Sequence, residues 1–216
     1  MIKAVFWDFG GVITTSPFES FNRFESSNGM PKDFIRSINA TNPDTNAWAQ
    51  FESSQVTLDE FDDLFAQETA AAGHEIRGKQ VIALLSGDLR PEMIETLHRC
   101  KTRYTIACLT NNVKGMNDED PQRAGDSSKA SKSREVMALF DHVIESSVVG
   151  IRKPNPKFYQ MACEMASVKP EEVVYLDDLG INLKPARQMG MTTIKVIDPI
   201  VALKELEQAV DLKLLD

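Results

Sequence analysis

Cysteine, histidine and long hydrophobic runs are all scarce in this sequence of 216 residues. The three cysteines are odd in number and have no paired spacing, so a disulfide framework is not expected and the thiols should be reduced. The three histidines lie far apart, without the spacing of a zinc site. If the protein binds a metal ion, oxygen ligands are therefore expected to hold it.

The sequence shows no pattern of a membrane-spanning or targeting segment. No stretch of about 18 uncharged apolar residues occurs, and the N-terminus lacks the basic and apolar regions of a secretory signal. We therefore expect a soluble, cytoplasmic protein without membrane insertion. The formal net charge of −8 opposes binding to nucleic acid and to anionic membranes. The sequence leaves the oligomeric state open.

Short β-rich segments alternate with helical patterns over most of the chain. The expected strands are Ile2–Trp7, Tyr104–Leu109, His142–Ile144, Val173–Leu176 and Thr192–Val196. The expected helices are Pro91–Cys100, Ser133–Phe140, Pro156–Ala166, Asn182–Met189 and Ile200–Ala209. This alternation is typical of an α/β fold with a parallel sheet that helices cover on both faces.

The interval 16–85 interrupts the alternation, because it contains helical patterns but no convincing strand. Thr57 and Glu60 form a capping-box pattern that marks one helix start. We predict a helical cap at 16–85, inserted into a Rossmann-like core formed by 1–15 and 86–216. A second irregular stretch, Lys114–Ser133, is rich in polar and turn-forming residues and is expected to be a mobile loop.

Polar residues occur at four places that the predicted sheet would bring to one edge. In an open parallel sheet, ligands bind beyond the carboxyl ends of the strands. The four places are Asp8, Thr110–Asn112, Lys153, and Asp177–Asp178 with Asn182. Each also has an ordinary structural explanation, such as a turn, a helix cap or a solvated lysine. Their combined order along the chain favours a functional site.

Three of these side chains are the groups that phosphoryl transfer needs. Asp8 follows an apolar strand and precedes a glycine turn, which suits a nucleophile. Thr110 offers a hydroxyl donor and Lys153 an ammonium group for the phosphate oxygens. The substrate class that fits this set is a small phosphate ester.

The remaining acids indicate a metal site. Mg²⁺ prefers carboxylate and carbonyl oxygens, which Asp8, the backbone of Gly10 and Asp178 could supply. Asp177 is a candidate for a further metal ligand, or for a residue that contacts the ligands without binding the metal itself. Asn182 could orient a lysine or a carboxylate from one helical turn away.

The chain resembles the haloacid dehalogenase superfamily over nearly its whole length. Residues that match the four motifs of this superfamily are, in chain order, Asp8, Thr110, Lys153 and Asp177–Asp178. The segments 145–154 and 175–191 closely resemble the N-terminal phosphatase domain of soluble epoxide hydrolases. The epoxide-opening domain of those proteins would follow the last residue here, so epoxide hydrolysis is not expected.

The resemblance implies a Rossmann-like core with a helical cap, a Mg²⁺ cofactor and a phospho-aspartyl intermediate on Asp8. It assigns Thr110 and Asn111 to the phosphate oxygens. It assigns Lys153 to the bridging ammonium group and Asp178 to the metal ion.

Gly10 departs from this pattern, because most phosphatases of the superfamily have an aspartate there that protonates the leaving group. General acid catalysis contributes about 10² to 10⁴ in rate, so poor leaving groups should react slowly. Water, an acid from the cap, or Asp118, Glu119 and Asp120 of the irregular stretch are alternative proton donors.

Two other functions stay open at this point. One is a 2-haloacid dehalogenase without a metal, which Asp177–Asp178 disfavours because two acids without a cation would repel a carboxylate substrate. The other is a catalytically weak phosphometabolite-binding or regulatory protein that lost its acid at Gly10.

Overall fold

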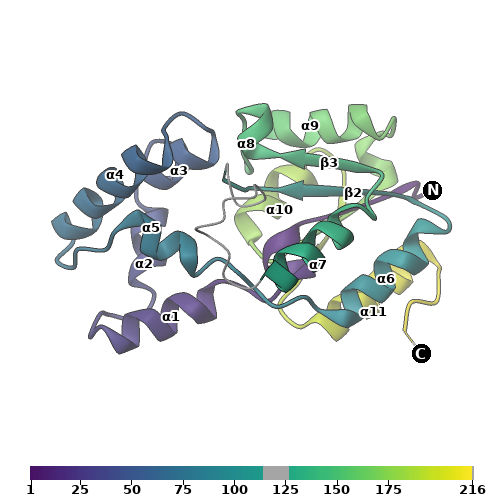
Figure 1. Cartoon of the computed structure of the whole chain (residues 1–216). Coiled ribbons are helices and arrows are strands. Elements are labelled where there is room, and N and C mark those ends of the chain that lie inside the picture. Colours follow the sequence, from purple (N-terminus) through teal and green to yellow (C-terminus); the bar gives the residue numbers. More distant parts are fainter. Residues whose placement is uncertain (114–126, 216) are drawn as a thin grey trace.

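The core is a five-stranded sheet with helices on both faces (Figure 1). The structure is a computed structural model that describes residues 1–113 and 127–215. The strands lie in the order β3-β2-β1-β4-β5, and all neighbours are parallel. Their bounds are β1 Ala4–Trp7, β2 Thr105–Thr110, β3 His142–Glu145, β4 Val173–Asp177 and β5 Thr192–Lys195. The predicted α/β fold is confirmed.

Two layers of helices cover this sheet. The core helices are α6 Pro91–Lys101, α7 Ser127–Met137, α8 Ser146–Val149, α9 Pro156–Met165, α10 Gly180–Gln188 and α11 Pro199–Val210, with a 3-10 turn at Pro170–Glu172. Trp7 packs in one apolar cluster with α6 and α11, and its neighbour Phe6 packs in another with α9 and α10. Both faces of β1 are buried, which explains its continuous hydrophobic run.

Five of the helices between β1 and β2 lie beside the sheet (Figure 1). We call them the cap helices; they are α1 Phe18–Ser27, α2 Phe34–Ala40, α3 Ala47–Glu52, α4 Leu58–Ala71 and α5 Gly78–Ala83. They have an apolar cluster of their own, in which the Phe51 and Phe61 rings stack at 4.5 Å. The Thr57–Glu60 capping box at the start of α4 is confirmed. The domain boundaries 1–15, 16–85 and 86–216 stay a prediction.

The two chain segments that join the cap helices to the core lie side by side. Thr14 forms an isolated antiparallel bridge with Leu89, and the Thr15 N–H donates to the Asp88 carbonyl at 2.8 Å. A Cβ atom on Gly87 would lie 2.5 Å from the Thr15 carbonyl oxygen, so only glycine allows this close approach.

The mobile loop predicted for Lys114–Ser133 was wrong in its last part, because α7 already begins at Ser127. The polar composition suggested a loop, but Val136 near the end of α7 and Phe140 just after it pack into the core and anchor the helix. Residues 114–126, and with them the acids Asp118, Glu119 and Asp120, lie outside the described residues.

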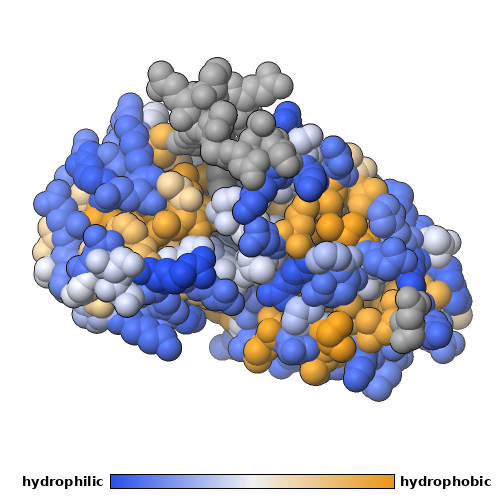
Figure 2. Space-filling view, turned by 60° about the horizontal axis from the view of Figure 1, so that its bottom comes forward, coloured by the Kyte–Doolittle hydropathy of each residue, from blue (hydrophilic) through white to orange (hydrophobic). Residues whose placement is uncertain are grey.

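The face of the molecule in Figure 2 is largely hydrophilic. Figure 2 shows hydrophilic residues over much of one face, with hydrophobic residues gathered in smaller patches. Within the described ranges, no helix combines the length and hydrophobicity that crossing a bilayer requires.

Candidate active site

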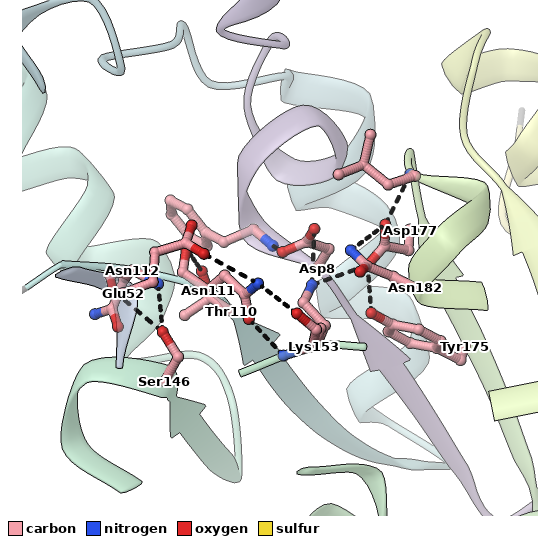
Figure 3. Close-up of polar contacts among 12 residues, drawn as sticks. Asp8, Glu52, Thr110, Asn111, Asn112, Ser146, Lys153, Tyr175, Asp177 and Asn182 are labelled. Atoms are coloured by element: carbon pink, nitrogen blue, oxygen red, sulfur yellow. Dashed lines mark hydrogen bonds and ion pairs between the residues drawn. The ribbon is translucent and has the colours of Figure 1, made fainter. Parts of the chain in front are cut away.

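The predicted site residues meet at the carboxyl edge of the sheet. In the register of the sheet, Trp7 of β1 pairs with Cys108 of β2 and with Leu176 of β4. Asp8 therefore follows the central strand at the level where the neighbouring strands end. Lys153 enters from the segment between α8 and α9 (Figure 3).

Lys153 forms two ion pairs at the centre of the site. Its Nζ atom lies 2.8 Å from Oδ2 of Asp8 and 2.8 Å from Oδ2 of Asp177. All three side chains are buried, with Lys153 only 1% exposed. A charge buried this deeply is tolerated only when it is paired, so the lysine is not the solvated residue that it could have been.

Asp177 is held by more donors than any other acid of the cluster. Its Oδ1 accepts the Leu179 N–H at 2.8 Å, and the Asn182 Nδ2 lies 3.1 Å from both oxygens. The hydroxyl of Tyr175 also donates to Oδ2. Asn182 thus orients a carboxylate, one of the two roles considered for it. Tyr175 was not identified from the sequence, although its position two residues before Asp177 on a strand puts both side chains on one face.

Burial and mutual repulsion raise the pKa values of the acids. Burial raises the pKa of Asp8 well above its usual range, Lys153 opposes this rise, and Asp177 adds to it. Burial and Asp177 together raise the pKa of Asp178 to about 6. For Lys153, burial lowers the pKa, but Asp177 and Asp8 outweigh burial and raise it. One ammonium group does not balance three acids, and a divalent cation would lower the pKa of the carboxyl groups.

The donor set fits a hard divalent ion. One oxygen from each of Asp8, Asp177 and Asp178 lies within 4.8 Å of the others. Oxygen ligands of this kind suit Mg²⁺. Asp177 is fully buried and four groups donate to its oxygens, whereas among the described residues Asp8 receives two donors and Asp178 is only partly buried. Asp8 and Asp178 are therefore the more accessible ligands.

Gly11 allows Asp178 to approach the turn after β1. Gly11 has a φ of +77°, and a Cβ atom there would lie 2.3 Å from Oδ2 of Asp178. The turn itself is a single π-type turn over Phe9–Ile13, and the Phe9 N–H donates to Oδ1 of Asp8 at 2.7 Å. The Asp178 carboxylate therefore packs against the backbone of Gly11, and no other residue could replace this glycine without strain.

Gly10, in contrast, is not required by packing. Its φ of −67° is ordinary for any residue, and no atom of the described residues lies within 4 Å of its ideal Cβ position. An added Cβ atom would therefore meet no close neighbour among the described residues.

Thr110 and Asn111 have different surroundings. Within residues 1–113 and 127–215, the buried Thr110 hydroxyl has one long contact, 3.5 Å to the Asn111 carbonyl, so it is available to a ligand. The Asn111 side chain instead bonds to the Lys153 backbone, accepting its N–H at 2.9 Å and donating to its carbonyl at 3.0 Å. Asn111 as a phosphate ligand stays a prediction.

Asn112 has a structural role at the start of α8. It accepts the Ser147 N–H at 3.2 Å and the Ser147 hydroxyl at 2.8 Å, and its own N–H donates to the Ser146 hydroxyl at 3.0 Å.

A carboxylate from the cap helices borders the site. Glu52, the last residue of α3, lies 2.8 Å from Nε of Arg152, and the Asn111 Nδ2 lies 3.5 Å from the same oxygen. Burial raises the pKa of Glu52, and Arg152, Trp48 and Lys153 oppose this rise. No sequence pattern identified Glu52, because the contact joins elements far apart in the chain.

A family profile of haloacid dehalogenase-like hydrolases matches residues 2–190 of this sequence. The chain belongs to this family. Mouse bifunctional epoxide hydrolase 2 is 30% identical over 96% of the chain, which spans 38% of that protein. The sesquiterpene phosphatase astK of Aspergillus oryzae is 25% identical, with 96% of each chain covered.

Solved structures agree with this family at the level of the fold. A haloacid dehalogenase-family enzyme of Bacteroides thetaiotaomicron, in complex with magnesium and inorganic phosphate, has a TM-score of 0.58 and 20% identity, with 90% of this chain and 94% of that chain covered. The predicted membership of the superfamily, the likeness to the epoxide hydrolase domain and the expectation of a hydrolase are confirmed.

Proposed function

We propose that this hydrolase is a magnesium-dependent phosphomonoesterase, which acts on a small organic phosphate through a phospho-aspartyl intermediate on Asp8. The main support is the buried cluster in which Lys153 pairs with Asp8 and Asp177 beside a third acid, Asp178. Phosphoryl transfer needs a nucleophile, cationic donors and acids for a divalent ion, and this cluster contains all three.

Asp8 is the proposed nucleophile. One of its oxygens bonds to phosphorus while the bond from phosphorus to the ester oxygen breaks. The electron pair of that bond leaves with the ester oxygen as an alkoxide or phenolate, which takes a proton from water to give the alcohol. Lys153 and the Thr110 hydroxyl bind the phosphoryl oxygens, where negative charge is concentrated. Asn111 belongs to the proposed phosphate-binding group and also holds the backbone of Lys153. Water then hydrolyses the acyl phosphate and releases inorganic phosphate.

Asp8, Asp178 and the carbonyl of Gly10 are the proposed ligands of Mg²⁺. When bound, the ion would neutralise charge on the transferring phosphoryl group. Asp177 is assigned to holding Lys153, because the ammonium group, Tyr175 and the backbone of Leu179 already bind its oxygens.

The leaving group receives no proton from position 10, because Gly10 has no side chain. Activated esters, whose leaving groups are stable as anions, should therefore be hydrolysed faster than alkyl esters.

The test is hydrolysis of an aryl phosphate with and without Mg²⁺. We expect turnover that needs the ion, is abolished by chelation and is lost in Asp8→Asn, which has the same shape but a weak nucleophile. Mass spectrometry of quenched reactions should detect a phosphoryl group on the peptide that contains Asp8. Turnover that survives in Asp8→Asn would refute the mechanism.

The same experiment separates the two alternatives. A 2-haloacid dehalogenase would release halide from a 2-haloacid without Mg²⁺ and would leave the aryl phosphate intact. A binding or regulatory protein would bind inorganic phosphate or the aryl phosphate without turnover.

A further inference from the structure

Glu52 is the buried acid by which the cap helices reach the active-site edge. It ends α3 and is 7% exposed. Its Oε2 atom lies 2.8 Å from Nε of Arg152, which directly precedes Lys153 in the chain. The same arginine donates from Nη1 to the carbonyl of Pro43 at 2.8 Å, so a second segment from the cap region also binds it.

The same Glu52 oxygen also lies near the Asn111 side chain, which is hydrogen-bonded to Lys153. The Asn111 Nδ2 lies 3.5 Å from this oxygen, and the Asn111 amide binds both the N–H and the carbonyl of Lys153. Figure 3 shows these contacts as one series that runs from Glu52 through Asn111 to Lys153 and Asp8. Glu52 therefore touches the residue before Lys153 and also the side chain that holds the Lys153 backbone.

We propose that Glu52 is a positioning residue, which couples the position of the cap helices to the placement of the Lys153 ammonium group between Asp8 and Asp177. The catalytic part of this inference rests on the proposed function, whereas the structural part does not. With Glu52 in contact, the segment that carries Lys153 is held from two sides. Asn111 holds it from the core, and Glu52 and the Pro43 carbonyl hold it from the cap region through Arg152. Movement of the cap helices away from the core would remove one of these two supports.

Another contact between the cap region and the core provides a matched control. The Ser54 hydroxyl, two residues after Glu52, donates to the Ser147 carbonyl at 2.8 Å. This bond also joins the two parts of the molecule, but it ends on α8 and not on the segment of Lys153. If Glu52 only helps to attach the cap region to the core, substitutions at Glu52 and at Ser54 should have similar effects. If Glu52 positions Lys153, only substitution of Glu52 should disturb Lys153.

The first readout is independent of catalysis. Hydrogen exchange of the peptide that contains the Lys153 amide is compared in wild type, Glu52→Ala and Ser54→Ala. We expect exchange of this amide to become about fivefold faster in Glu52→Ala, which corresponds to the net free energy of one hydrogen bond, and to stay unchanged in Ser54→Ala. Equal exchange in both variants would overturn the proposal. If circular dichroism shows that Glu52→Ala is unfolded, Glu52→Gln, which keeps the shape and removes the charge, takes its place.

The second readout is the split between kcat and KM. A displaced lysine should lower kcat by about tenfold to a hundredfold, with little change in KM, because misplacing a catalytic group slows the chemical step more than it weakens binding. The loss should be equal for an aryl and an alkyl phosphate. A loss confined to the alkyl phosphate would make Glu52 a proton donor and would overturn a positioning role. If wild type has no phosphatase activity, the proposed function fails, and the exchange experiment still decides the role of Glu52.

Discussion

Gly10→Asp should convert the protein into a faster phosphatase for esters with poor leaving groups. The backbone at Gly10 has a φ of −67°, and no described atom lies within 4 Å of its ideal Cβ position, so the aspartate enters without a clash. The new carboxyl group stands two residues after Asp8, close to an acidic cluster. Repulsion from that cluster should raise the pKa of the new carboxyl, which favours the protonated form that an acid catalyst needs.

The size of the gain follows from the missing proton transfer. General acid catalysis contributes about 10² to 10⁴ in rate, or about 3–5 kcal/mol of transition-state stabilisation. An alkyl phosphate should gain most of this factor, and an activated aryl phosphate should gain little. The free energy of unfolding should change by no more than about 1 kcal/mol, since replacing glycine restricts the unfolded chain while the added charge is repelled in the folded one.

The assay is kcat/KM for a series of phosphate esters whose leaving groups differ in pKa. In wild type, kcat/KM should fall steeply as the pKa of the leaving group rises. In Gly10→Asp, kcat/KM should depend less on that pKa. Gly10→Asn, of equal size but without a proton to donate, should follow the wild-type decline. If folded Gly10→Asp shows as steep a decline of kcat/KM with leaving-group pKa as wild type, the reasoning is refuted.

Gly11→Ala is the contrasting change. The Cβ atom of the alanine would lie 2.3 Å from Oδ2 of Asp178, so this substitution should disturb Mg²⁺ binding.

Three further predictions concern the acids and the groups that hold them. Tyr175→Phe removes a donor to Asp177 and should lower kcat by about fivefold or more. Tyr159→Phe, which among the described residues removes a hydrogen bond to the Asn182 carbonyl, should leave kcat unchanged, and similar losses in both variants would contradict this. Lys153→Met leaves two buried acids unpaired and should lower the free energy of unfolding by about 3–5 kcal/mol in urea denaturation, and an unchanged denaturation midpoint would contradict it. The pKa of Asp178 is raised to about 6, so the folded protein binds more protons than the unfolded chain between about pH 4 and 6. Without Mg²⁺, the stability of wild type relative to Asp178→Asn should therefore fall as the pH rises through that window, while Mg²⁺ binding tightens; melting curves across this range should show both trends.

The sheet and the positions of the site residues could be predicted to a large extent. Strands buried on both faces have continuous apolar runs, as in Ala4–Trp7, and polar residues directly after them mark the carboxyl edge. The start of α7 was misplaced, because a polar sequence resembles a loop until its distant packing partners are known. Whether this segment forms a helix depends on its packing against core residues elsewhere in the chain, and the composition of the segment gives no information about them.

The contacts inside the site could be predicted only in part. The type and order of Asp8, Lys153 and Asp177 indicated one cluster, and they do lie together. The sequence did not indicate that the Asn111 amide binds the Lys153 backbone, since the two are 42 residues apart. Nor did it indicate the contacts of Glu52, which is 59 residues from its Asn111 partner.

By itself, the sequence determined the α/β class, the hydrolase family and the residues that meet at the sheet edge, because strand periodicity and motif order are local properties that a parallel sheet translates into position. The tertiary structure alone decided which donors hold Asp177, why Gly11 but not Gly10 must be glycine, and where a cap helix touches Arg152 beside Lys153. These outcomes depend on distances of a few ångströms between side chains from separate elements, and such distances are set by packing in three dimensions and not by spacing along the chain.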